Sequence, residues 1–196
     1  MNSKEADIRR TVGIYNMIPN LFWSALLLIP VTVFCYSLMN PKTFWIFLSI
    51  SLLAVFLPKT FFDKLQLSST GKLYKRIGVH FINNFTQNGT VINKLIRKRY
   101  PTYKVVSSKS MDIKGLISQT YMFEKFHFIL FVFFVLTMAY AISIERYGWS
   151  LFFFVSNIVY NVYPSFLQQY IRIRLKIAAR RADDIDGYST HRNIGT

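Results

Sequence analysis

Residues 126–144 read FHFILFVFFVLTMAYAISI, and residues 149–167 read WSLFFFVSNIVYNVYPSFL. Only the turn Glu145-Arg146-Tyr147-Gly148 separates these two stretches, and neither contains an Asp, Glu, Lys or Arg. A helix needs about 20 predominantly apolar residues to cross the hydrocarbon core of a bilayer. The two stretches therefore predict a hairpin of membrane-spanning helices.

A second pair of apolar stretches lies nearer the N-terminus. Residues 19–38 contain no charge, and residues 44–57 follow after the turn Met39-Asn40-Pro41-Lys42. The latter stretch reaches spanning length only with its flanks, over residues 43–62, so it could also be a tilted or re-entrant segment. A small-residue cleavage site is absent after the first stretch, which favours a retained hairpin over a signal peptide.

The composition agrees with an integral membrane protein. Of the 196 residues, 52% are hydrophobic and 17% aromatic. Such a chain is too apolar to be disordered, and its single cysteine, Cys35, excludes a disulfide scaffold.

The charge is unevenly distributed. Lys and Arg number 24 against 9 Asp and Glu, and 13 of the basic residues lie between Lys59 and Lys125. Because Lys and Arg are enriched in cytoplasmic segments, we expect a multi-pass protein of the cell membrane with both termini in the cytoplasm. Nucleic acid is not needed to explain this charge.

These patterns predict an all-α fold, a membrane four-helix bundle of two hairpins with a basic cytoplasmic loop of short helices. The expected parts are a leader and first hairpin over 1–62, with spans at about 19–38 and 43–62; the basic loop over 63–125; a second hairpin over 126–171, with spans at about 126–144 and 149–168; and a basic tail over 172–196.

Glu124 and His127 lie three residues apart where the third apolar stretch begins. Residues at this spacing share a helix face, and a carboxylate that bonds one imidazole nitrogen makes the other a better base. The pair could deprotonate an alcohol. It could instead be interfacial, with both side chains reaching the lipid headgroups.

Polar residues also recur along the fourth stretch at spacings of 4, 4, 3 and 4, namely Asn157, Asn161, Ser165, Gln168 and Arg172. They predict one polar helix face. Because polar groups inside a span are costly without partners, this face should line the bundle or a wet cavity. Hydrogen bonds that hold helices together are an equally good interpretation.

Tyr170, Arg172 and Arg174 follow where the fourth stretch leaves the membrane. Alternate arginines can bind phosphates bidentately, or they can anchor the chain to anionic lipid headgroups. In an antiparallel hairpin these residues reach the same depth as Glu124, His127 and Gln168. Asn161 should lie about 10 Å deeper.

Several common sites are missing from the sequence. No G-x-S-x-G, Walker A, dinucleotide or H-x-x-x-x-D motif occurs, and His80, His127 and His191 are isolated from one another. We therefore expect no metal and no bound cofactor.

Residues 55–180 resemble the bacterial glycosyl-4,4'-diaponeurosporenoate acyltransferases, membrane enzymes of carotenoid tailoring. Glu124 and His127 match an E-x-x-H at the start of a late span in that family. The family's N-V-(x5)-Q-x-Y-N-R-x-R-L pattern is matched by Asn161, Val162, Gln168, Tyr170, Arg172, Arg174 and Leu175. Weaker matches are Leu57-Pro58-x-x-Phe61-Phe62 and Gly71-Lys72-Leu73-Tyr74. Ile171 departs from the pattern, and Pro164 lies one residue later than in the family.

The resemblance implies a carotenoid-biosynthesis enzyme that transfers a fatty acyl group from an acyl thioester, such as acyl-CoA, to a sugar hydroxyl of a lipid-soluble acceptor. That acceptor would be a glycosylated isoprenoid, a carotenoid or a glycolipid. His127 would be the general base, oriented by Glu124. Arg172 and Arg174 would hold the donor's phosphates, and Asn161 or Gln168 would bind the oxyanion.

Two other functions fit the same residues. One is a non-catalytic membrane protein of accessory or immunity type, in which the basic rim anchors the chain beside a lipid or a partner protein. The other is a different lipid-modifying transferase.

Overall fold

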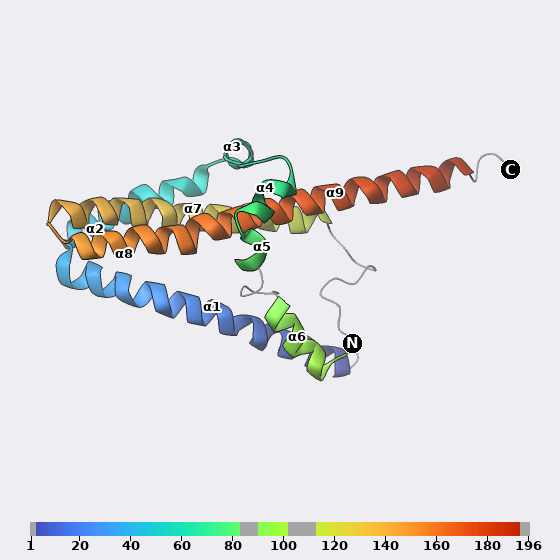
Figure 1. Cartoon of the computed structure of the whole chain (residues 1–196), viewed down its shortest axis with the longest axis horizontal. Helices are drawn as coiled ribbons and strands as arrows, with labels where there is room; N and C mark the ends of the chain where they lie inside the picture. Colours follow the sequence, from blue (N-terminus) through green and yellow to red (C-terminus); the bar gives the residue numbers. More distant parts are fainter. Residues whose placement is uncertain (1–2, 83–89, 102–112, 193–196) are drawn as a thin grey trace.

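The computed structural model describes residues 3–82, 90–101 and 113–192, and every regular element within these ranges is a helix (Figure 1). The all-α class is therefore confirmed. Helix α7 (Ile113–Ser143) packs antiparallel to one long run, which consists of α8 (Tyr147–Asn157), the π-helical turn η3 (Ile158–Val162) and α9 (Tyr163–Arg192).

Three helical runs are long and apolar enough to cross a membrane: residues Ala6–Leu38 of α1 (Ser3–Leu38), all of α7, and Tyr147–Arg180. The helices extend beyond the predicted spans at their basic ends. In α7, the helix begins at Ile113 rather than near residue 126, because Thr120, Tyr121 and Glu124 recur at helical spacing and are buried against neighbouring elements.

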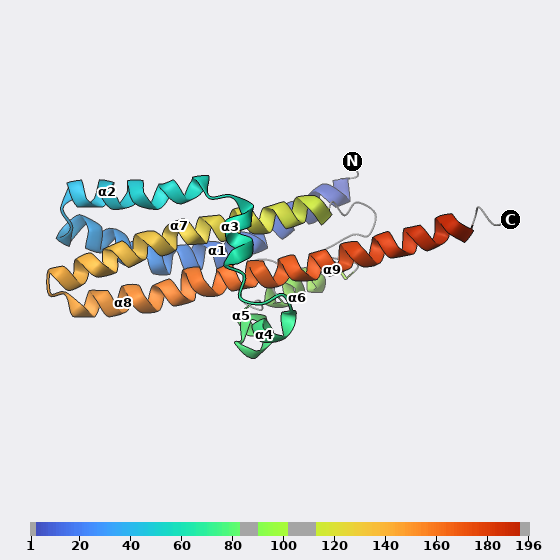
Figure 2. The same ribbon diagram turned by 90° about the horizontal axis from the view of Figure 1, so that it is seen from above.

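The predicted span over 43–62 is not confirmed as a fourth membrane crossing. Helix α2 (Pro41–Leu52) continues only through the short 3-10 turn η1 (Leu53–Phe56). Leu57 is extended with ψ 130°, because a residue before proline disfavours the helical conformation, and Pro58 has no N–H to continue the helix. Helix α3 (Lys59–Lys64) then turns across α7 (Figure 2).

An aromatic core joins α1, α7 and α8 at the end of the bundle where the hairpins turn. Phe34 is completely buried, and its ring meets that of Phe153 edge-on at 4.9 Å between centroids. The other buried members of this core are Val31, Met39, Phe133, Phe134 and Ala141. Large apolar burial of this kind fixes which helices are neighbours.

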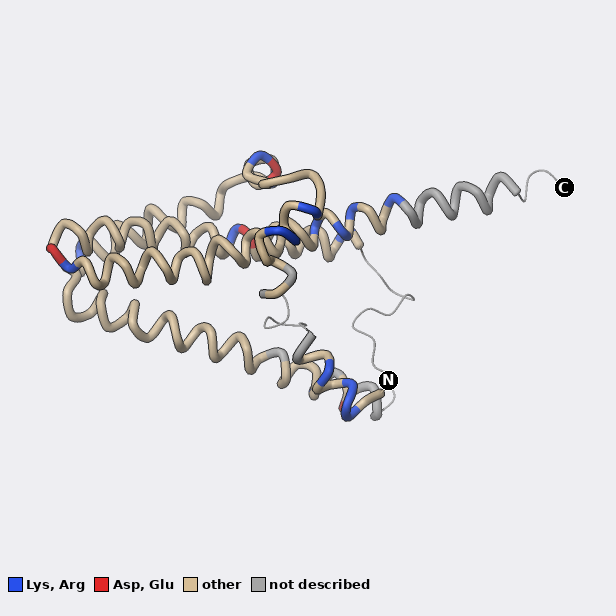
Figure 3. Tube along the Cα trace, viewed as in Figure 1, with Lys and Arg blue, Asp and Glu red and all other residues tan. Residues whose placement is uncertain are grey.

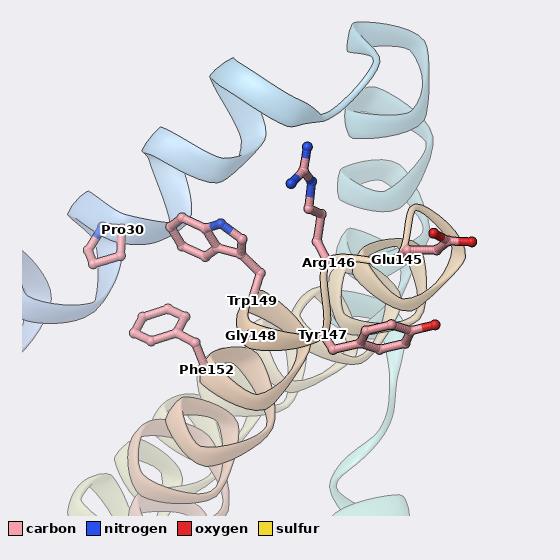
Figure 4. A pocket seen from close by; sticks show the side chains of 7 residues that line it. All are labelled: Pro30, Glu145, Arg146, Tyr147, Gly148, Trp149 and Phe152. Carbon is pink, nitrogen blue, oxygen red and sulfur yellow. The ribbon is translucent and has the colours of Figure 1, made fainter.

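The turn between α7 and α8 is tight. Glu145 is left-handed with φ 59°, and the Arg146 N–H bonds the Ala141 carbonyl at 2.8 Å, which closes the C-terminus of α7. An open hollow of about 590 Å³ lies beside this turn. Figure 4 shows Arg146 and Trp149 pointing from it toward α1.

Lys and Arg residues gather at the opposite end of the molecule, over α4 (Gly71–Arg76), α6 (Thr90–Arg99) and α9 (Figure 3). We call this the cationic end. The short helix α5 (Val79–Ile82) packs beside α4 and α9. Helix α6 instead lies along the N-terminal part of α1, where the Tyr100 hydroxyl donates to Asp7 at 2.5 Å.

Candidate functional site

Helices α7 and α9 are joined near the cationic end by a buried ion pair. Arg172 Nη1 donates to Glu124 Oε2 at 2.6 Å, and the two residues are only 0% and 2% exposed. Gln169 Nε2 donates to the other carboxylate oxygen, Oε1, also at 2.6 Å. Both oxygens of Glu124 are therefore used by side chains of α9.

Aromatic and amide groups surround this ion pair. The guanidinium of Arg172 lies over the Tyr121 ring, 4.1 Å from its centroid, and the Tyr121 hydroxyl donates to Asp63 at 2.6 Å. Gln169 Oε1 accepts from the Tyr74 hydroxyl at 2.9 Å. Through these bonds the pair connects α7 and α9 to the segment that carries α3 and α4.

Tyr74 is fully buried in a small apolar cluster with Leu167, Tyr170 and Ile173. Burial, the largest cause, raises the pKa of its hydroxyl above the ordinary value. The hydroxyl therefore stays protonated at neutral pH and can donate to Gln169. Tyr74 is the aromatic residue of the segment Gly71-Lys72-Leu73-Tyr74. Its burial against α9 explains why an aromatic side chain is suited to this position.

The predicted pair of phosphate-binding arginines is split by the helix. Arg172 is fully buried, whereas Arg174 is exposed and lies 5.9 Å from the Tyr170 ring centroid. Residues two apart on an α-helix do not share a face, so the two guanidiniums point to different surroundings. Within the described chain, Nε and Nη2 of Arg172 have no hydrogen-bond partner.

His127 does not bond Glu124 as predicted. Its Nδ1 is buried without a hydrogen-bond partner among the described residues, while Glu124 uses both oxygens for α9. The imidazole instead lies against η3, 5.9 Å from the Tyr160 ring centroid, and interacts with the side chain of Asn161. The hydroxyls of Tyr160 and Ser24 are 3.4 Å apart, so α1 borders the same region.

The polar face of the fourth stretch is divided between two roles. Asn157 Nδ2 donates to the Phe131 carbonyl of α7 at 3.2 Å, and Asn161 Nδ2 donates to Asn157 Oδ1 at 2.7 Å. Both amides are buried. Ser165 and Gln168 are only half-buried.

Gln169, not Gln168, is the glutamine that enters the buried network. A π turn advances each residue by a smaller angle than an α-helix does, so η3 shifts the face that follows it by about one residue. Pro164 is the sequence feature that could have indicated this shift, because it removes the N–H that would bond the Tyr160 carbonyl in an α-helix.

The structure therefore brings Glu124, Gln169 and Arg172 into one cluster and His127 with Asn161 into another. No group of three His, Cys, Asp or Glu side chains in the described ranges is arranged to hold a metal. The hollow beside Trp149 is lined by the α7–α8 turn and by no residue of either cluster.

Three helices of membrane-spanning length and a buried polar site are the features of a helical membrane protein. A family model described as glycosyl-4,4'-diaponeurosporenoate acyltransferase matches residues 58–181. The chain belongs to this family, and the match covers both polar clusters. No curated protein and no solved structure matches the chain.

Proposed function

We propose that this protein is an integral membrane O-acyltransferase that moves a fatty acyl group from acyl-CoA to a sugar hydroxyl of a glycosylated carotenoid. The chief support is His127, a half-buried imidazole whose Nδ1 is buried, next to amides in the region matched by an acyltransferase family. An ionisable group inside a membrane span favours a functional site over a purely structural role.

The proposed step needs one base. His127 takes the proton of the sugar hydroxyl as its oxygen attacks the thioester carbonyl carbon. Collapse of the tetrahedral intermediate breaks the C–S bond, and the imidazolium returns its proton to the departing thiolate. The products are an ester and free CoA thiol.

The other predicted residues take supporting roles. Because Asn161 Nδ2 already donates to Asn157, we assign oxyanion binding to half-buried Gln168. Glu124 and Arg172 hold α7 against α9 and act as positioning residues for His127, which lies one turn from Glu124.

The direct test uses the full chain in liposomes with glycosylated 4,4'-diaponeurosporenoate and labelled acyl-CoA. We expect a pigment ester heavier by one acyl group, released together with an equal amount of CoA thiol, and no ester from the pigment without its sugar. If these liposomes bind both compounds and form no ester, the proposed function is wrong.

Exposed cations beside the site are suited to the phosphates of the donor. Arg174 of α9 is exposed, and α4, which packs on α9, exposes Lys72 and Lys75. Converging cations bind phosphates by charge-assisted hydrogen bonds.

The charge-reversing variant Arg174→Glu is therefore expected to raise KM for acyl-CoA about tenfold, with kcat nearly unchanged, since such a bond contributes about 1.5–3 kcal/mol. Steady-state kinetics at fixed acceptor concentration measures both constants. Lys42→Glu, an equal charge change at the opposite end, should leave KM unchanged. An unchanged KM in the Arg174 variant would place the phosphates elsewhere.

We further propose that the cationic end faces the cytoplasm at the cell membrane, with both termini on that side. Helix α6 buries Ile92 and Ile96 and exposes Lys94, Arg97, Lys98 and Arg99. A short basic amphipathic helix of this kind suits a surface of anionic lipid headgroups.

A further inference from the structure

The two buried asparagines form a chain of hydrogen bonds with a fixed direction. Its first member is the Phe131 carbonyl, which can only accept, so Asn157 must present its Nδ2 there. Asn157 Oδ1 then accepts from Asn161 Nδ2 at 2.7 Å. The direction of the first bond thus fixes how both amides are oriented.

This series of hydrogen bonds leaves Asn161 Oδ1 as an acceptor without a donor. Oδ1 is buried and has no hydrogen-bond partner in the described part of the chain, and the same is true of Nδ1 of His127. The two side chains interact with each other. One buried acceptor and one buried ring nitrogen, each without a hydrogen-bond partner in the described residues, thus belong to neighbouring side chains.

We infer that the Asn157–Asn161 amide chain sets the tautomer of His127: Nδ1 carries the hydrogen and donates to Asn161 Oδ1, and Nε2 carries the lone pair. Asn161 and Asn157 are then positioning residues for the base. The catalytic meaning of this assignment rests on the proposed function, but the tautomer itself does not.

The opposite tautomer is disfavoured by the same contacts. It would place the lone pair of Nδ1 against the lone pairs of Asn161 Oδ1 and leave two buried acceptors without a donor. Each unsatisfied buried group costs about 1–3 kcal/mol. Among the described residues, the Tyr160 backbone also interacts with the imidazole, and donation from Nε2 to that carbonyl is the alternative to be tested.

Glu124 does not set the tautomer in this arrangement, because the Nδ1 of His127 has no hydrogen-bond partner among the described residues. Its two carboxylate oxygens accept from Gln169 and Arg172 at 2.6 Å each. An amide also suits this position better than a carboxylate, because a neutral acceptor orients the ring without stabilising an imidazolium before substrate binds.

Nitrogen NMR of the full chain in lipid nanodiscs tests the tautomer directly. A background with His80→Gln and His191→Gln leaves His127 as the one labelled histidine. We expect Nδ1 to give a protonated, pyrrole-like shift and Nε2 a pyridine-like shift at a pH where the ring is neutral. A pyridine-like Nδ1 overturns the inference whatever the enzyme's activity.

Replacing Asn157, which fixes the orientation of the Asn161 amide, should change the tautomer of His127. In Asn157→Leu the Asn161 amide is free to turn its Nδ2 toward the ring, so we expect a large fraction of the opposite tautomer. The kcat should fall about tenfold or more with little change in KM, because general-base catalysis is lost in that fraction.

Two variants separate this effect from a general loss of packing. Asn157→Asp keeps an oxygen for Asn161 Nδ2 and should preserve the tautomer and most of kcat. Thr137→Val removes another buried hydrogen bond of α7, to the Phe133 carbonyl, and should change neither. An unchanged tautomer in Asn157→Leu overturns the role of Asn157. An inverted tautomer with unchanged kcat supports the amide chain and rejects His127 as the base.

Discussion

Membranes that carry the His127→Ala variant are expected to form pigment ester about 10²- to 10⁴-fold more slowly than wild type, the range that general-base catalysis contributes. The loss should fall on kcat, because the donor's phosphates bind to other groups. Ester formation in liposomes, measured at several acyl-CoA concentrations, gives both constants.

The melting temperature of the same variant in detergent distinguishes lost chemistry from lost folding. Ser143→Ala is a suitable control, since its hydroxyl bonds the Tyr140 carbonyl at the other end of α7, and it should retain full activity. A well-folded His127→Ala protein with the wild-type rate would remove His127 from the mechanism.

Breaking the buried ion pair should produce the largest loss of stability. Arg172→Met leaves the Glu124 carboxylate buried beside Gln169 with no compensating charge, and the loss of one partner of such a pair costs about 3–5 kcal/mol. Glu124→Leu should cost a similar amount, because it strands the guanidinium. The free energy of unfolding in mixed detergent measures both.

The double variant Glu124→Leu, Arg172→Met is expected to be more stable than either single variant, because no unpaired charge is left buried. The exposed pair of Lys176 and Asp63, 3.7 Å apart, supplies the contrast. Lys176→Gln should cost no more than about 1 kcal/mol. If the two single losses simply add in the double variant, Glu124 and Arg172 are not coupled.

Long apolar runs made the second hairpin predictable. No other backbone satisfies its own hydrogen bonds within a single uncharged segment of that length, so residues 126–144 and 149–167 had to be helices. The antiparallel arrangement of this hairpin also placed Glu124 and Arg172 at the same depth. The sequence did not show that they bind each other, because spacing along a helix does not show which of several neighbours a carboxylate will choose.

Rotation of successive residues around the helix axis explains the other differences between the predicted site and the observed one. The alternate positions of Arg172 and Arg174 looked like one phosphate clamp, but a helix turns them to different sides. Gln168 lies at regular α-helical spacing from Asn161, but the π turn at Ile158–Val162 brings Gln169 into the buried network instead. A local change of helix type is difficult to predict from periodicity alone.

The early end of the second apolar helix bears on how two unlike substrates meet. The run Pro41–Phe56 is about 25 Å long, shorter than the roughly 30 Å of a typical hydrocarbon core. Lys125 donates to the Val55 carbonyl at its end, at 2.6 Å. An apolar helix shorter than the hydrocarbon core is accommodated by thinning of the bilayer, by flanking side chains that reach the interface, or by oligomerisation. Under the proposed function, a polar layer that reaches down to Lys125, two residues from His127, would let a water-soluble thioester meet an acceptor that stays in the lipid.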